Sequence, residues 1–175
     1  MKRRSLLRSM GRAARLDAHF FEEVEADPSS IGQAFVVVLL TCFAGSAAAG
    51  VNGLPWVRMA TDFLEPLLLW TAGGAFAYMV GATFLRGPHT ATSYREVLRT
   101  TGFAFAPGIL RLGAVLPGSL GFGVMVAGDV WLLVASIVAV RQALDFTTLR
   151  AIGTFGLAYA LLWLTFEGFL FSLPV

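Results

Sequence analysis

The sequence has little of the chemistry that enzymes commonly use. It contains one cysteine, Cys42, two histidines, His19 and His89, and a single lysine among thirteen basic residues. One cysteine excludes an intrachain disulfide and a cysteine-based metal cluster. Charged residues make up only 14% of the chain, whereas 57% are hydrophobic and the mean hydropathy is +0.73. This composition is not that of a soluble globule, and we expect a single domain embedded in lipid.

Catalytic and nucleotide-binding motifs are missing as well. No GxSxG, HExxH, P-loop or GxGxxG pattern occurs in the required context. His19 and His89 fall in segments expected to be cytoplasmic, so neither is placed to ligate a haem at membrane depth. The arginines follow the expected membrane topology rather than a groove with stacking aromatics, which argues against nucleic-acid binding. We therefore expect no enzyme activity, no cofactor and no metal.

Five apolar segments are long enough to cross a bilayer, which takes about 20 residues for a hydrocarbon core of about 30 Å. We predict an all-α bundle of five transmembrane helices over residues 31–175, preceded by a short amphipathic cytoplasmic segment over residues 1–30. The expected spans are residues 31–51, 63–85, 101–117, 120–140 and 151–171.

Capping residues mark where these helices begin. Asp27 precedes Pro28 before the first span, and Asp62 is the expected cap of the second. The third follows a capping box that begins at Ser93. Inside it, Pro107 removes a backbone donor, so we expect a helix kink there.

Basic residues set the expected orientation, because Lys and Arg in short loops stay in the cytoplasm. Arg58 lies on the opposite side and Arg111 lies within a span, which leaves eleven of the thirteen on the side of the N-terminus. We expect the N-terminus in the cytoplasm and the C-terminus outside. A cleaved signal peptide ending near Ala47–Ala49 is the alternative for the first span, but acidic residues separate that span from the basic N-terminus.

The N-terminal segment has a helical pattern of its own. Apolar residues recur at three- and four-residue steps from Ser5 to Ala26, which predicts one surface helix. Its arginines suit anionic headgroups at the inner leaflet. A solvated tail and a helix that docks onto a partner are the alternatives.

Small residues recur every four positions in the expected spans, and such stripes let helices approach closely in lipid. The sequence does not decide whether these stripes pack against other helices of the same chain or form a homodimer face. The stripes are Gly73, Ala77 and Gly81 in the second span, Thr41, Gly45 and Ala49 in the first, and Gly102 with Ala106 in the third.

Three ionisable residues lie within or near the expected spans: Arg111, Asp129 and Glu167. A charge at membrane depth is costly and normally faces a partner inside the bundle. A tight hairpin between the third and fourth spans would bring Arg111 level with Asp129, so we expect these two to pair. The alternative is that Arg111 extends towards the membrane surface and Asp129 finds a neutral donor.

The stretch from Tyr94 to Pro107, YREVLRTTGFAFAP, resembles the hallmark of the Yip1 family. Residues 16–28 are similar to the pre-membrane signature of its bacterial branch, and residues 140–151 to a cytoplasmic connection of that branch. The positions that carry the resemblance are Tyr94, Arg99, Gly102, Pro107, Arg141 and Asp145.

The resemblance implies a five-helix integral membrane protein, here of the bacterial inner membrane. In eukaryotic relatives it implies contacts with prenylated GTPases during vesicle traffic. Their long cytoplasmic N-terminal region is reduced here to about thirty residues, so the architecture carries over and the GTPase partner does not.

Three functions fit the sequence. The first is a non-enzymatic scaffold or accessory protein that binds the bilayer and a membrane-protein partner or a second copy. The second is a small transporter, channel or lipid-moving protein that uses the intramembrane charges. The third is a dedicated subunit of a larger membrane complex.

Overall fold

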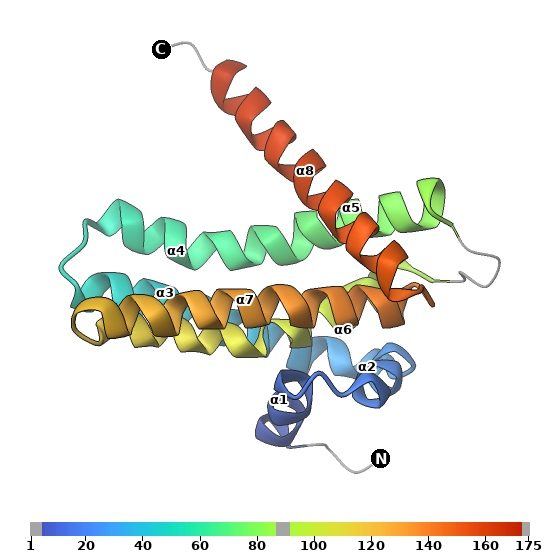
Figure 1. Ribbon diagram of the computed structural model, residues 1–175, viewed down its shortest axis with the longest axis horizontal. Coiled ribbons are helices and arrows are strands. Elements are labelled where there is room, and N and C mark those ends of the chain that lie inside the picture. The colour runs from blue at the N-terminus through green and yellow to red at the C-terminus, as the bar shows by residue number, and fades with distance from the viewer. Residues whose placement is uncertain (1–4, 87–91, 173–175) are drawn as a thin grey trace.

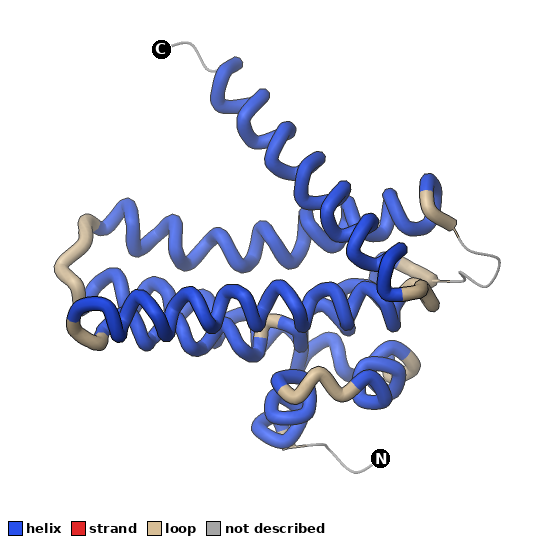
Figure 2. Tube along the Cα trace, in the orientation of Figure 1, coloured by secondary structure: helices blue, strands red, loops and turns tan. Residues whose placement is uncertain are grey.

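The computed structural model describes residues 5–86 and 92–172, without the side chains of residues 166–172. Within these ranges every regular element is a helix (Figure 2). The predicted all-α class is therefore confirmed. His89 lies outside the described residues.

The N-terminal segment forms two short helices, α1 (Leu6–Ala14) and α2 (Ala18–Glu25). The single helix expected from Ser5 to Ala26 is therefore wrong. Leu16 adopts a positive φ of 59° between the helices, and Asp17 caps α2 by accepting a hydrogen bond from the Phe20 amide. A positive φ interrupts a helix, and apolar spacing alone does not reveal it.

The first long helix, α3 (Ile31–Val51), occupies the residues expected for the first span. It continues from a single 3-10 turn, η1 (Pro28–Ser30), and Asp27 caps that turn by accepting a bond from the Ser29 amide at 3.0 Å. Helix start and cap thus follow the local sequence, since Asp and Pro at these positions favour initiation.

The second long helix begins earlier than expected. It runs through α4 (Trp56–Leu68), η2 (Leu69–Gly73), α5 (Gly74–Met79) and η3 (Val80–Phe84), where η2 and η3 are π-helical turns. We call this continuous element the second rod.

Asp62 and Pro66 consequently lie inside the second rod, and the expected cap at Asp62 is wrong. Pro66 has no amide hydrogen, so it cannot donate to the Asp62 carbonyl as a helical residue would. That carbonyl oxygen lies beside Gly45 of α3, 3.2 Å from where a Cβ would stand. A glycine at this position lets α3 approach the rod closely.

The third apolar segment changes helix type near Pro107. Helix α6 (Tyr94–Ala104) ends before the proline, and a 3-10 helix, η4 (Ala106–Val115), continues to the turn. The kink expected at Pro107 therefore takes the form of an α-helix that ends and a narrower helix that begins. Together the two pieces are about 36 Å long, at about 1.5 Å per α-helical and 2.0 Å per 3-10 residue.

Helices α7 (Gly118–Ala143) and α8 (Thr148–Ser172) complete the chain. In the described residues, four helices are long and apolar enough to cross a membrane: residues 28–51, 56–84, 118–143 and 148–165. A helical membrane bundle follows from them. The predicted span at 101–117 is not among them because it is divided between α6 and η4.

Figure 1 shows α3, the second rod, α6 with η4, and α7 lying side by side, whereas α8 leaves them at a steep angle. Helices α1 and α2 lie against one flank. One apolar core joins the N-terminal helices to the bundle and includes Phe20, Phe21, Val37, Val38 and Phe103.

Small residues create the closest helix contacts. A Cβ on Gly102 would stand 2.8 Å from Ala34 and 3.0 Å from the Trp70 indole nitrogen, and one on Gly81 would stand 2.4 Å from Leu144. Gly73 differs from the expected stripe, because a Cβ there meets nothing within 4 Å. Gly74 faces Leu98 instead, while Ala77, Gly45 and Ala49 are buried as part of the packing.

We predict opposite effects for two glycine-to-alanine substitutions. Gly102→Ala should lower the melting temperature in detergent and cost about 1–3 kcal/mol, because the added methyl overpacks the contact with Ala34 and Trp70. Gly73→Ala is the matched control and should leave stability unchanged or raise it by up to about 1 kcal/mol, because alanine favours helix. Equal melting temperatures for the two variants would contradict the packing described here.

Candidate functional site

Helix α6 carries the stretch from Tyr94 to Pro107 into the centre of the bundle. The capping box is present, since the Ser93 amide donates to Glu96 Oε2 at 2.7 Å and the Glu96 amide donates to Ser93 Oγ at 3.4 Å. The Tyr94 hydroxyl donates to the Thr71 carbonyl at 2.9 Å. Every residue from 99 to 108 is buried, so this stretch packs helices together rather than lining an open active site.

Arg99 is a buried cation attached to the N-terminal segment. Its side chain is 8% exposed and its Nη2 lies 3.8 Å from Glu96 Oε1. The same nitrogen donates to the main-chain carbonyl of Glu25 at the end of α2. A buried guanidinium needs partners for its donors, so Arg99 links the position of α2 to that of α6.

The Glu25 carboxyl lies beside this link. Its pKa is raised to about 7, mainly because burial disfavours the charged carboxylate. The negative charges of Asp145 and Glu96 act in the same direction, and the Arg99 guanidinium opposes them. Three carboxylates from α2, α6 and the α7–α8 connection therefore share one corner of the molecule with a single buried arginine.

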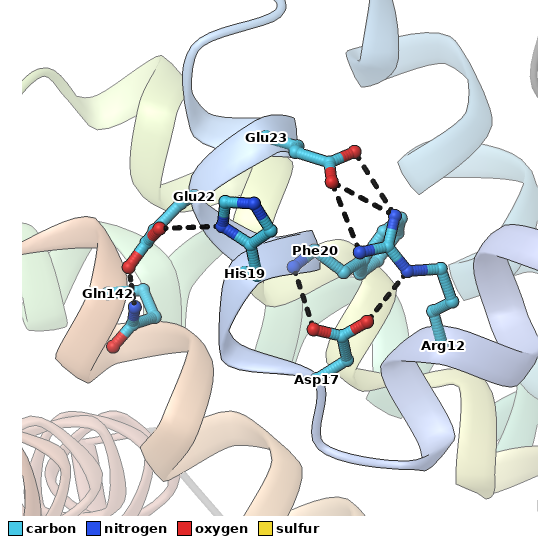
Figure 3. Close-up of polar contacts among 7 residues, drawn as sticks. All are labelled: Arg12, Asp17, His19, Phe20, Glu22, Glu23 and Gln142. Carbon is cyan, nitrogen blue, oxygen red and sulfur yellow. Dashed lines mark hydrogen bonds and ion pairs between the residues drawn. The ribbon is translucent and has the colours of Figure 1, made fainter.

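A polar network holds α1 to α2 (Figure 3). Arg12 Nε donates to Asp17 Oδ2 at 2.7 Å, and its terminal nitrogens donate to the Glu23 carboxylate at 3.1–3.2 Å. The hydrogen bond from Arg12 lowers the pKa of Asp17. The guanidinium also lies over the Phe20 ring, 5.1 Å from its centroid. These contacts close the turn at Leu16 that separates the two helices.

The two N-terminal helices are docked on the bundle itself. Phe20 and Phe21 are fully buried, and Phe20 packs edge-to-face on Phe103 with ring centroids 5.2 Å apart. Gln142 Nε2 donates to Glu22 Oε1 at 2.8 Å, as Figure 3 shows. Trp131, halfway along α7, donates to the Ala14 carbonyl at 2.8 Å. Helix α1 therefore lies beside the middle of α7 rather than beyond its end.

Arg141 and Asp145 shape the connection from α7 to α8. Arg141 donates to Gln142 Oε1 at 3.0 Å and to Thr148 Oγ1 at 3.4 Å. Asp145 has a positive φ of 51°, which ends α7. Aspartate is among the residues that tolerate this left-handed conformation best. Both residues thus serve the turn between helices.

The charges expected at membrane depth form a second cluster. Arg111 Nε donates to Asp129 Oδ1 at 3.0 Å, so the predicted pair is present. Glu65 of the second rod is a further partner, with its Oε2 3.6 Å from Arg111 Nη1. The Arg111 side chain is 18% exposed, and those of Asp129 and Glu65 are about half exposed. The side chain of Glu167 lies outside the described residues.

Glu65 was not among the ionisable residues that the sequence led us to expect at membrane depth. Asp62 pairs with Arg58 one turn earlier, at 3.1 Å. An ionisable residue inside an expected span was the signal that could have found Glu65. Thr41 was expected only as a small residue, yet its hydroxyl also donates to the Phe105 carbonyl at 2.8 Å, next to Pro107.

Among the described residues, no group of three or more His, Cys, Asp or Glu side chains is placed to hold a metal ion. Cys42 is buried in α3. The polar groups described above bond to one another and to main-chain atoms, which is an arrangement that positions helices.

A double-mutant cycle tests the cluster at Arg111. Arg111→Leu leaves Asp129 and Glu65 without their cation and should cost about 2–4 kcal/mol in detergent. Asp129→Leu should cost less, because Glu65 remains as a partner of Arg111. The double mutant should lose less than the sum of the two, as expected for groups in contact.

Arg58→Leu is the control, because the Arg58 side chain is 62% exposed and surface pairs contribute little. Additive losses at Arg111 and Asp129 would show that the pair is not coupled.

The family model described as the Yip1 domain matches residues 16–168. No curated protein and no solved structure matches the chain. The matched region includes α2, the α6 stretch with Arg99, and the connection that carries Arg141 and Asp145. The chain therefore belongs to the Yip1 family.

Proposed function

We propose that this Yip1-family chain is a non-enzymatic scaffold or accessory protein that organises other membrane proteins or the bilayer. The observation that carries the proposal is the use of the motif residues. Three of them lie on α6 and contact other helices: Arg99 contacts α2, Tyr94 contacts the second rod, and Gly102 packs against α3 and the second rod. A chain whose most distinctive residues hold helices together is suited to presenting surfaces rather than to chemistry.

Helix α8 supplies such a surface. One stripe of it, which includes Ala151 and Ala158, is buried against the bundle. The rest is exposed and apolar, and Leu157, Tyr159 and Trp163 are each at least half exposed. Because α8 diverges from the other helices (Figure 1), its exposed face is available to a second copy or a membrane-protein partner. Small exposed residues, Gly153 and Gly156, would allow a close approach.

We propose five spans, with α6 and η4 together as the third. Their combined length of about 36 Å exceeds the hydrocarbon thickness of about 30 Å. In this arrangement the inner ends of the bundle carry most of the basic residues, which supports a cytoplasmic N-terminus and an outer C-terminus in the bacterial inner membrane.

Helices α1 and α2 form a cytoplasmic segment that lies in the membrane interface. Gln142, one residue from the cytoplasmic end of α7, donates to Glu22 of α2, which fits this placement. The 26 residues of α7 are about 39 Å long, so it extends beyond the hydrocarbon, and amphipathic helices enter the interface by about 5–10 Å.

Reporter fusions test the topology. Fusions after Arg15, within residues 87–92 and within residues 144–149 should report cytoplasm, because basic residues flank these sites. Fusions after Gly53 and after Val175 should report the outside. A cytoplasmic C-terminus would exclude an odd number of spans with the N-terminus inside.

Affinity purification in a mild detergent tests the scaffold. We expect a companion, either a second copy or other membrane proteins, that binds through α8. Gly156→Leu should release it, because the substitution alters the exposed face of α8. Gly123→Leu on α7 is the matched control, since a Cβ at either glycine meets nothing within 4 Å and both variants should fold.

The outcomes separate the functions. A monomer without a companion, or a companion that both variants retain, would contradict a scaffold acting through α8. A single other membrane protein at fixed stoichiometry would instead assign the chain as a dedicated subunit.

The charge cluster favours a small transporter as the second candidate. Arg111, Asp129 and Glu65 lie on three different long elements, and such residues in membrane proteins often mark a path for ions or substrates. If the Arg111→Leu/Asp129→Leu protein keeps its fold but loses a cellular phenotype, the charges act in function and the transporter replaces the scaffold.

A further inference from the structure

A cavity of about 1230 Å³ lies where the N-terminal helices meet the beginning of α3. Its walls come from α1, α2, the turn before α3, the first turns of α3, and one side chain of α6. We call it the N-terminal cavity. It is lined by Ser5, Leu6, Arg8, Ser9, Arg12, Phe20, Val24, Asp27, Ser29, Ser30, Gly32, Gln33, Val36 and Phe103.

One wall of the N-terminal cavity offers hydrogen-bond donors. Arg8 and Ser9 are neighbours on α1. Arg8 is exposed and has no ion pair within the described part of the chain. Ser9 is only 3% exposed and lines the cavity beside Arg8. A serine hydroxyl on a cavity wall can donate one hydrogen bond to a ligand.

The neighbouring charges are already used within the protein. Arg12 is bonded to Asp17 and Glu23, and Asp27 accepts bonds from the amide and the hydroxyl of Ser29. Among the described residues of this wall, Arg8 is therefore the cation that remains to attract a negatively charged group, and Ser9 adds a neutral donor beside it. A guanidinium with a hydroxyl is a common way to hold phosphate oxygens.

The other wall is apolar. Phe20 and Phe103 are fully buried or nearly so behind it, and Val24 lies beside them. Val36 of α3 is 39% exposed and lies one turn further along the helix than Gly32. The cavity thus changes from polar to apolar in the direction in which α3 runs into the bundle.

This change of polarity coincides with the level at which the chain enters the bilayer. Helix α3 is a 21-residue apolar helix that begins at Ile31, and such a helix is just long enough to cross the hydrocarbon. Its first turn therefore lies near the headgroups, where lipid phosphates are found, and Val36 lies at the depth of the acyl chains.

We propose that the N-terminal cavity binds one membrane glycerophospholipid. Arg8 and Ser9 hold the phosphate, and the acyl chains run past Phe103 and along Val36. Bound lipid then fills the gap between α1 and α3 and joins the docked N-terminal helices to the surrounding bilayer. The recognised group is a phosphodiester attached to acyl chains. Free phosphate lacks the acyl chains, and an uncharged diacylglycerol lacks the phosphate.

The test uses the full-length protein in a maltoside detergent, which contains no phosphate. Phosphatidylglycerol, phosphatidylethanolamine, diacylglycerol and inorganic phosphate are added separately, and bound lipid is counted by native mass spectrometry together with the melting temperature. We expect one molecule of either phospholipid to bind and to raise the melting temperature. Arg8→Gln should weaken this binding about tenfold, as the loss of a charge-assisted bond predicts.

Arg15→Gln is the matched control, because Arg15 is exposed next to α1 and does not line the cavity. A second pair does not depend on charge. Gly32→Phe places a ring in the cavity and should abolish binding, whereas Gly11→Phe, outside the cavity, should not. Neither glycine has an atom within 4 Å of an added Cβ, so both variants should fold.

Three results would overturn the proposal. Equal binding of diacylglycerol would show that the phosphate is not recognised. Equal stabilisation by inorganic phosphate would make the cavity a site for a free anion. Binding that is the same in all four variants would place the lipid on the outer surface of the bundle instead.

Discussion

The close approach of α6 to its neighbours is the contact on which the rest of the structure depends. Because Gly102 has no side chain, Ala34 and Trp70 can pack directly against the backbone of α6. Trp70 also donates to the Leu98 carbonyl at 2.9 Å across the same interface. In lipid, the burial of apolar surface does not drive helices to associate, so close packing and hydrogen bonds between helices must hold them together. With α6 held in the centre, Arg99 reaches the end of α2, and Phe103 receives Phe20 from the N-terminal segment.

The polar residues follow the same logic. The two arginines of the bundle interior contact groups on other elements: Arg99 bonds to α2, and Arg111 contacts both α7 and the second rod. At the break near Pro107, the Thr41 hydroxyl donates to the Phe105 carbonyl, which also accepts from the Gly108 amide at 2.8 Å. Backbone groups in lipid must be satisfied inside the protein, and the Thr41 bond joins the broken third segment to α3. Membership of the Yip1 family agrees with a chain whose characteristic residues build contacts between helices.

Several parts of the fold were predictable because they depend on neighbouring residues. The start of α3 after Asp27 and Pro28, and the capping box at Ser93, follow from local hydrogen bonds. The pairing of Arg111 with Asp129 was predictable because a short turn between η4 and α7 leaves few registers. The start of the second rod was not, since Asp62 has the chemistry of a cap, yet it lies in the interior of α4 and pairs with Arg58 one turn earlier.

The sequence by itself determined the helical class, the approximate extents of α3, α7 and α8 and the family, because composition, hydropathy and short motifs act along the chain. Only the tertiary structure decided that residues 5–26 form two helices, that both dock beside α6 and α7, and that Gly74 rather than Gly73 faces a neighbour. The π-helical turns of the second rod shift which side chains share a face, and the positive φ of Leu16 reverses the chain. The docking of α1 and α2 and the role of Gly74 depend on contacts between segments far apart in the sequence, which no local pattern contains.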